Sequence, residues 1–104
     1  PVVTRAEASL ERLFATLAKQ HGGFAFKIDA SAMAGAPDRL LLLPGHDPFL
    51  VELKTTKGKL APHQQRLHER LEGKGFRVHT LYGAEQIRAF FASVSGAGGS
   101  GPSA

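Results

Sequence analysis

The 104-residue chain contains no cysteine and no tryptophan, and only one methionine and one tyrosine. The absence of cysteine excludes a disulfide framework, iron–sulfur clusters and cysteine-based zinc sites. No apolar run approaches the ~20 residues of a membrane span, and the N-terminus lacks the basic-then-apolar pattern of a signal peptide. We therefore expect a soluble, cytoplasmic protein, and a chain of this length suits a single domain.

Several signatures of catalytic sites are also missing. His63 and His68 are five residues apart, a spacing that points them to different sides of a helix, and no His-x-x-x-His pair indicates a zinc site. The serines form no Gly-x-Ser-x-Gly elbow, and the glycines follow no phosphate-loop spacing. The 13 lysines and arginines exceed the 9 acids and give a net charge of +4, which mildly favours an anionic partner.

The hydrophobic pattern predicts an α/β domain with the element order α-β-β-β-α-β-α. The helices are expected over 4–21, 62–72 and 84–91, and the strands over 24–29, 39–43, 49–53 and 76–81. Thr4 and Glu7 have the spacing of a capping box. Phe24, Phe26 and Ile28 alternate on one side of a half-buried strand.

The two strands over 39–43 and 49–53 are continuous apolar runs, which are typical of strands in the middle of a sheet. The turn formers at 44–48 join them into a hairpin. Residues 95–104 are all glycine, serine, alanine or proline, and we expect them to be a flexible tail after a domain spanning 1–94.

Charged residues interrupt the most apolar part of the chain. Glu52 and Lys54 share one face of their strand because they are two residues apart. If the hairpin turns about Gly45 and His46, opposed residues have numbers summing to roughly 90–92. This register places Asp38 across from Glu52 or Lys54 and on the same face as both.

Two carboxylates beside an ammonium group have two interpretations. The cluster can be a structural ion network at a strand end, or an oxygen-ligand site for Mg²⁺ in which the lysine stabilises charge on a phosphate. The functional interpretation is favoured because the acids lie in apolar strands that are predicted neighbours, and because Pro37 restricts the approach to Asp38.

Other polar residues could complete such a site. Gln64 lies on the apolar stripe of the second helix, and its position there fits equally an inward amide at the site and a partly solvated edge residue. Glu7 in the first helix is either a cap or a ligand, with Glu11 as the alternative acid at that end. Lys57 and Lys59 are either a solvated loop or contacts to nucleic-acid phosphates.

Three blocks in order resemble a known family. Gly-Ala-Pro-Asp-Arg at 35–39, Phe-Leu-Val-Glu-Leu-Lys at 49–54 and Pro-x-Gln at 62–64 are similar to the PD-(D/E)xK nuclease pattern, and more narrowly to the VRR-NUC family. The resemblance covers roughly residues 7–82. It implies a single restriction-endonuclease-like domain with an α-β-β-β-α-β core, a mixed four-stranded sheet and a short C-terminal helix.

The resemblance also implies a site and a reaction. Asp38, Glu52 and the Leu53 carbonyl would bind Mg²⁺ or Mn²⁺, Lys54 would assist the attacking water, and Gln64 and an acid of the first helix, best Glu7, would line the site. Arg39, Lys57 and Lys59 are the candidate nucleic-acid contacts.

The expected activity is metal-dependent hydrolysis of phosphodiester bonds in branched DNA. Small relatives of bacterial and viral origin resemble Holliday-junction resolvases that act as homodimers, and we expect the same here. Flap or other branched-DNA cleavage, an RNA-cleaving relative and a non-catalytic DNA-binding module are the alternatives. The sequence contains no base-reading helix and no stacked aromatic set, which predicts weak sequence preference and salt-dependent affinity.

Overall fold

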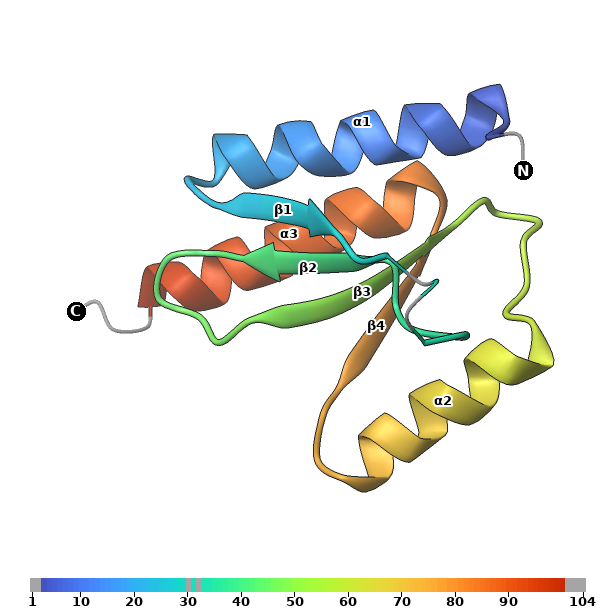
Figure 1. Cartoon of the computed structure of the whole chain (residues 1–104). Coiled ribbons are helices and arrows are strands. Elements are labelled where there is room, and N and C mark those ends of the chain that lie inside the picture. The colour runs from blue at the N-terminus through green and yellow to red at the C-terminus, as the bar shows by residue number, and fades with distance from the viewer. Residues whose placement is uncertain (1–2, 30, 32, 101–104) are drawn as a thin grey trace.

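The computed structural model describes residues 3–29, 31 and 33–100, with backbone alone for 95–100. The chain folds in the predicted order (Figure 1). The elements are α1 (Arg5–Gln20), β1 (Phe24–Lys27), β2 (Arg39–Leu42), β3 (Phe49–Lys54), α2 (Pro62–Gly73), β4 (Val78–Tyr82) and α3 (Gly83–Ser100). No helix in this described part combines the length and the apolarity that crossing a bilayer requires.

The four strands form one mixed sheet in the order β1-β2-β3-β4. The first three strands are antiparallel, and β4 runs parallel to β3 after the crossover through α2. In the β2–β3 hairpin Arg39 pairs with Val51 and Leu41 pairs with Phe49, so the paired numbers sum to 90, as predicted. β2 and β3 are the central strands, which confirms the interpretation of their continuous apolar runs.

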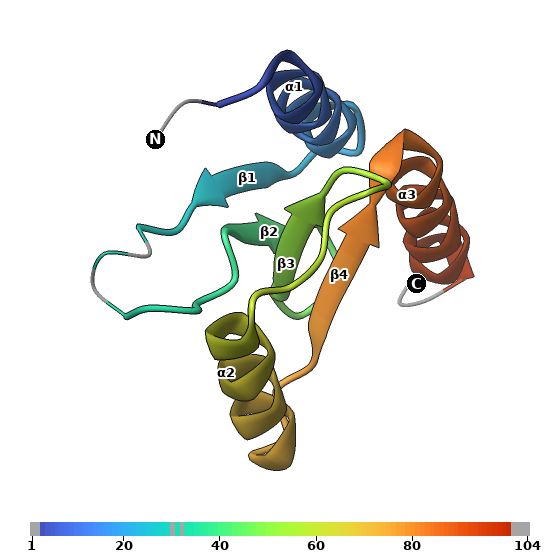
Figure 2. The ribbon, with the colours of Figure 1, turned by 90° about the vertical axis from the view of Figure 1, so that its right-hand side faces the viewer.

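The hydrophobic core lies between the sheet and the pair of helices α1 and α3. Alternate residues of β2 and β3 point to this face, where Leu41 and Val51 are fully buried. Phe14 of α1 and Phe91 of α3 meet edge to face with ring centroids 5.4 Å apart. α2 stands apart from these helices and packs against the other face at the β3–β4 side (Figure 2).

Local signals explain where the first two helices begin. Thr4 caps α1 by accepting from the Glu7 amide at 3.0 Å, and the Glu7 side chain accepts from the Thr4 amide at 2.9 Å, so the predicted capping box is confirmed. α2 begins at Pro62, whose fixed φ suits the first helical position.

Two predictions are corrected by the structure. Phe24 and Phe26 do lie on one side of β1, but that side faces solvent, because α2 covers only the opposite edge of the sheet. The last helix is longer than expected: its backbone stays helical to Ser100, since each added residue continues an existing hydrogen-bonded helix despite the cost of glycine. The rest of the expected tail, 101–104, lies outside the described residues.

Candidate active site

The polar ends of β2 and β3 bring two carboxylates together, as the hairpin register predicts. Asp38 directly precedes β2, and its Oδ1 accepts a hydrogen bond from the Leu53 amide of β3 at 3.2 Å. Glu52 lies in β3 on the face that α2 covers, and only 3% of it is exposed. A small cavity of about 240 Å³ is lined by both acids together with Glu7, Leu10, Glu11, Leu53 and Lys54.

The loop before β2 fixes the position of Asp38. Gly35 adopts a φ of +92°, and a Cβ at this position would lie 2.6 Å from the His63 carbonyl oxygen in the first turn of α2. The loop can therefore approach the helix this closely only with glycine. Pro37 is buried, and the Asp38 carbonyl accepts from the Ile28 amide at 2.9 Å. The backbone conformation of the Gly-Ala-Pro-Asp block thus positions the Asp38 carboxylate at the cavity.

Lys54 brings the only cationic side chain among the residues that line this cavity. Its Nζ lies 3.9 Å from Glu52 Oε2, and most of the side chain is shielded from solvent. The alternation of β3 puts Glu52 and Lys54 on the same face, as predicted. The carboxylates of Asp38 and Glu52 and the amine of Lys54 therefore lie together. Of the two registers that the sequence allowed, the observed one places Asp38 across from Glu52.

Gln64 faces inward and links α2 to the site. Its Oε1 accepts from the Ala61 amide at the start of the helix at 2.8 Å, and its Nε2 donates to Glu52 Oε2 at 3.4 Å. One amide thus caps the helix and holds the carboxylate. Of the two positions that the sequence allowed for Gln64, the inward one is observed.

His68 is a site residue that the sequence analysis missed. It is buried one turn after Gln64, and its Nε2 lies 3.7 Å from Glu52 Oε1. These two atoms are both buried without a hydrogen-bond partner among the described residues. The signal was present in the four-residue spacing from Gln64, which puts both side chains on one helix face.

The burial of both acids opposes their ionisation. Desolvation and, after it, the neighbouring Asp38 carboxylate raise the pKa of Glu52 to about 7, against the opposing effect of Lys54. Desolvation also raises the pKa of Asp38, although the Arg39 guanidinium and the Leu53 amide act in the other direction. Burial lowers the pKa of His68, and Lys54 adds to this effect. The site therefore favours a bound cation over two bare carboxylates.

Both candidate acids of α1 line the cavity, but each has a structural partner. Glu7 is exposed and takes part in the capping box. Glu11 is half-buried, and its Oε1 lies 3.2 Å from Arg39 Nη2 and 3.6 Å from Lys27 Nζ. The ion pairs engage Glu11, so Glu7 is the acid of α1 that is held by no cation in the described residues.

Arg39 does not occupy the position expected of a DNA contact. Only 5% of it is exposed, and its Nη1 donates to the Asp38 carbonyl at 2.9 Å while its Nη2 pairs with Glu11. Arg39 follows Asp38 in the chain, so the strand alternation directs it to the α1 face. In this structure the buried guanidinium holds α1 to β2, and the phosphate contact of Arg39 stays a prediction.

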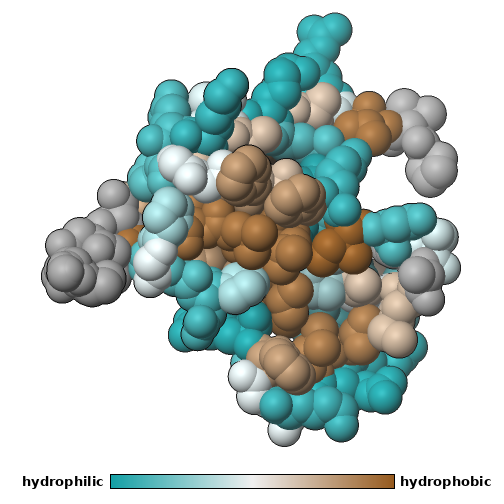
Figure 3. Space-filling view, turned by 60° about the vertical axis from the view of Figure 1, so that its left-hand side comes forward, coloured by the Kyte–Doolittle hydropathy of each residue, from teal (hydrophilic) through white to brown (hydrophobic). Residues whose placement is uncertain are grey.

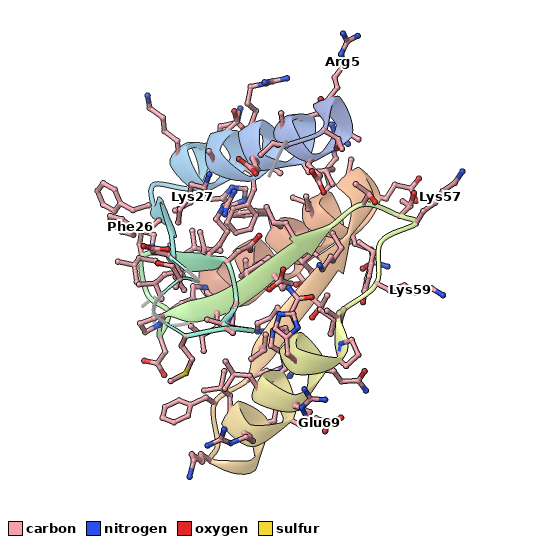
Figure 4. The ribbon with its side chains drawn as sticks, turned by 45° about the vertical axis from the view of Figure 1, so that its right-hand side comes forward. Arg5, Phe26, Lys27, Lys57, Lys59 and Glu69 are labelled. Atoms are coloured by element: carbon pink, nitrogen blue, oxygen red, sulfur yellow. The ribbon has the colours of Figure 1, made fainter. Side chains whose placement is uncertain are left out.

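Lys57 and Lys59 lie on the connection between β3 and α2, and both are exposed. Figure 4 shows both side chains extending away from this connection into solvent. They begin three residues after Lys54, so they stand near the cavity without lining it. Their position is compatible with phosphate contacts beside the site.

The donor set fits a hard divalent cation. Among the described residues, no three His, Asp or Glu side chains gather closely enough to hold a metal ion by themselves. Mg²⁺ commonly takes only one or two carboxylates and keeps several waters, so the Asp38–Glu52 pair meets this requirement. The raised pKa of Glu52, and its Oε1 without a hydrogen-bond partner among the described residues, indicate a carboxylate whose charge Lys54 compensates only in part.

Comparisons with known proteins agree with this geometry. The sequence is 36% identical over 75 residues to "Putative nuclease p44" of Acyrthosiphon pisum secondary endosymbiont phage 1, covering 72% of this chain and 81% of that protein. A solved VRR_NUC domain superposes with a TM-score of 0.77 at 28% identity, covering 86% of this chain and 97% of that one. A second, a VRR_NUC domain protein, has a TM-score of 0.62 at 14% identity over 91% and 89% of the two chains, and shares the fold.

The family itself is matched across most of the chain. The VRR-NUC domain family aligns with residues 2–85, a span that contains every residue of the candidate site. The same span holds the α1-β1-β2-β3-α2-β4 core that the structure places around the cavity. The chain therefore belongs to the VRR-NUC domain family, a branch of the PD-(D/E)xK nucleases.

Proposed function

We propose that this protein is a Mg²⁺- or Mn²⁺-dependent DNA endonuclease that selects branched structures, and most specifically a Holliday-junction resolvase. The observation that carries the proposal is the convergence of Asp38, Glu52 and Lys54 on one cavity, with both carboxylates desolvated. A pure binding module has no use for two carboxylates directed at a phosphate backbone, because they repel it. The family and the named phage relative support nuclease chemistry.

Each residue of the candidate site has a separate role in the proposed hydrolysis. Asp38 and Glu52, with the Leu53 carbonyl as the further expected ligand, would hold the cation, which when bound neutralises phosphate charge and lowers the pKa of water. Gln64 keeps the Glu52 carboxylate in place through its hydrogen bond. Lys54 supplies a fixed positive charge for the oxygens on which negative charge develops. A water oxygen bonds to phosphorus, the ester bond breaks, and the leaving oxygen takes up a proton.

The proposed substrate follows from the resemblance to Holliday-junction resolvases. A four-way junction needs two symmetric cuts, and two copies related by a two-fold axis supply them. We therefore expect the active form on junctions to be a homodimer. The exposed Lys57 and Lys59 beside the cavity support a phosphate-rich partner.

The decisive experiment is a cleavage panel of labelled four-way junction, flap, nicked duplex, linear duplex and single-stranded DNA, and matched RNA, over a titration of Mg²⁺ and Mn²⁺. We expect metal-dependent cutting, strongest on the junction, that Asp38→Ala removes. Cleavage mainly of flaps would replace the resolvase proposal with a flap nuclease, and cleavage mainly of RNA would replace the substrate class. Metal-independent binding without cutting, unchanged by Asp38→Ala, would show a non-catalytic module.

A further inference from the structure

The side of the sheet that carries Glu52 also carries an apolar surface that no helix or strand of the described residues covers. Phe24 pairs with Leu42, and Phe26 pairs with Leu40, which in turn pairs with Leu50 of β3. Paired residues of neighbouring strands point to the same side. These five residues, named here the apolar face, form a continuous patch without a charged side chain.

Exposure in this patch is large. Phe24 and Phe26 are 65% and 49% exposed, and their rings stack on each other with centroids 6.3 Å apart. Leu40, Leu42 and Leu50 are each partly exposed. Figure 3 shows apolar residues as a band that crosses the middle of this side of the molecule. Aromatic side chains on a strand normally face a core, so their exposure here calls for a partner.

A cleft of about 940 Å³ adjoins the apolar face. It lies between β3 and the end of α2. Its apolar walls come from Pro48, Leu50, Leu71 and Phe76, and its lining also includes the oppositely charged Asp47 and Arg77. Phe76, in the turn between α2 and β4, is 56% exposed. Leu50 belongs both to the apolar face and to the lining of the cleft, so the two form one surface. Phe24 and Phe26 on β1 are its ridge, and the cleft is its recess.

We propose that the apolar face and this cleft form the surface through which two copies of the chain associate. An isologous interface requires one patch that is complementary to itself, and a patch with both a ridge and a recess meets this requirement when the ridge of each copy enters the recess of the other. The absence of charge on the five residues of the apolar face makes a nucleic-acid backbone an unsuitable occupant.

The area of this surface matches the apolar part of a standard dimer interface. A buried aromatic side chain contributes roughly 150–250 Å², so the exposed parts of the three phenylalanines amount to roughly 300 Å². The partly exposed leucines bring the patch to roughly 400–500 Å², close to the apolar part of a standard interface of about 800 Å² per partner. Patches of this size on a monomer are often functional.

The inference deepens the proposed homodimer, and so rests on the proposed function for its role in cutting junctions. Along β2 and β3 the apolar face ends only two residues before Asp38 and Glu52, or roughly 7 Å at the usual strand rise. The remaining wall of the active-site cavity comes from α1, on the other side of the sheet. Association through the apolar face therefore brings two cavities near each other without closing them.

The test is the oligomeric state of the full chain, measured by sedimentation equilibrium from about 1 to 100 µM. We expect wild type at twice the chain mass of 11.1 kDa. The double substitution Phe24→Glu with Phe26→Glu should weaken the dimer by at least about 100-fold. Val3→Glu, at a residue that is 54% exposed and lies outside the patch, is the matched control and should change nothing.

Circular dichroism shows whether each variant is folded, and if the double variant is not, Phe76→Glu at the far end of the surface decides by the same measurement. A monomeric wild type, or a dimer that survives these substitutions, overturns the interface. The nuclease proposal is judged separately: a wild type that dimerises as expected but cuts no DNA would refute the activity alone. A monomer that cuts would refute the interface and the expected homodimer but not the nuclease activity.

Discussion

The polar end of β2 and β3 and the apolar face that includes β1 reverse the usual rule for which side chains are buried. Glu52 is a carboxylate and is almost wholly buried under α2, whereas Phe24 and Phe26 are aromatic and lie open on the same side of the sheet. Charged groups are normally exposed and aromatic groups normally buried. Each region therefore has a proposed partner: a cation at the polar end, and a second copy of the chain at the apolar face.

The largest effect should come from removing the charge at the polar end. Lys54→Ala should lower the cleavage rate by at least about 100-fold, because the cavity loses its fixed positive charge for the developing phosphate charge. Calorimetry should show that Mg²⁺ or Mn²⁺ still binds, since both carboxylates remain. The dimer mass should be unchanged, because Lys54 lies outside the apolar face.

Lys57→Ala is the matched control for that prediction, because it removes an exposed lysine three residues away. Its catalytic rate at saturating DNA should stay close to wild type. If Lys54→Ala turns over normally, or if the two variants lose activity equally, the distinction between the cavity lysine and the loop lysines is wrong.

The second prediction concerns Arg39, which holds α1 against β2 next to the polar end. Arg39→Ala should lower the free energy of unfolding by about 2–4 kcal/mol, because it removes a buried side chain together with its ion pair to Glu11 and its hydrogen bond to the Asp38 carbonyl. Lys27→Ala removes the other cation beside Glu11, but Lys27 is 70% exposed, so the loss should stay below about 0.5 kcal/mol. Urea denaturation of both variants measures the difference, and equal losses would contradict the structural role of Arg39.

Sequence reasoning predicted the arrangement where local rules are strong. The turn-forming segment between β2 and β3 fixed the register, and the register put Asp38 beside Glu52. Proline at the start of α2 predicted the helix that carries Gln64. These features depend on neighbours in the chain, so the residue pattern contains them.

The features that sequence reasoning missed depend on which element covers which surface. Period-two alternation shows that Phe24 and Phe26 share a side, but it cannot show that α2 stops short of them. Arg39 carries a guanidinium group, which is a common phosphate ligand, and it follows Asp38 in the sequence. Only the packing of α1 onto β2 shows that it is a buried partner of Glu11. The spacing between His63 and His68 argues against a zinc site, but it does not show that His68 lies one helical turn from Gln64 and faces Glu52.

The third prediction uses pH to test the desolvation of the polar end. The pKa of Glu52 lies near 7 in the folded chain, above its ordinary value of 4.5, so the folded state binds the proton more tightly than the unfolded state. The free energy that Glu52 contributes to folding is therefore most favourable below about pH 4.5, where the carboxyl is protonated in both states. This contribution is lost as the pH rises through about 7. Glu52→Gln cannot ionise, so in EDTA it should be more stable than wild type at pH 8.5, by about 2–3 kcal/mol at most, with little difference at pH 5.

Urea denaturation at the two pH values measures this difference, and added Mg²⁺ supplies an internal check. The cation should stabilise wild type at pH 8.5 and leave Glu52→Gln nearly unchanged, because only wild type keeps the pair of carboxylates. An advantage of the variant that is the same at both pH values would mean that Glu52 is not held in a desolvated site.

The smallest effect tests whether DNA approaches the polar end at all. Lys57 and Lys59 extend from the connection after β3 (Figure 4), and each phosphate contact contributes about 0.9 to the salt dependence of affinity. Lys57→Ala with Lys59→Ala should therefore weaken junction binding modestly and reduce the slope of log K against log salt by about 2. Lys19→Ala, an exposed lysine near the opposite end of α1 from Glu7, should leave the slope unchanged. If the double variant and Lys19→Ala behave alike, phosphates do not pass beside the Asp38–Glu52 cavity, and the charge that binds DNA lies on another surface.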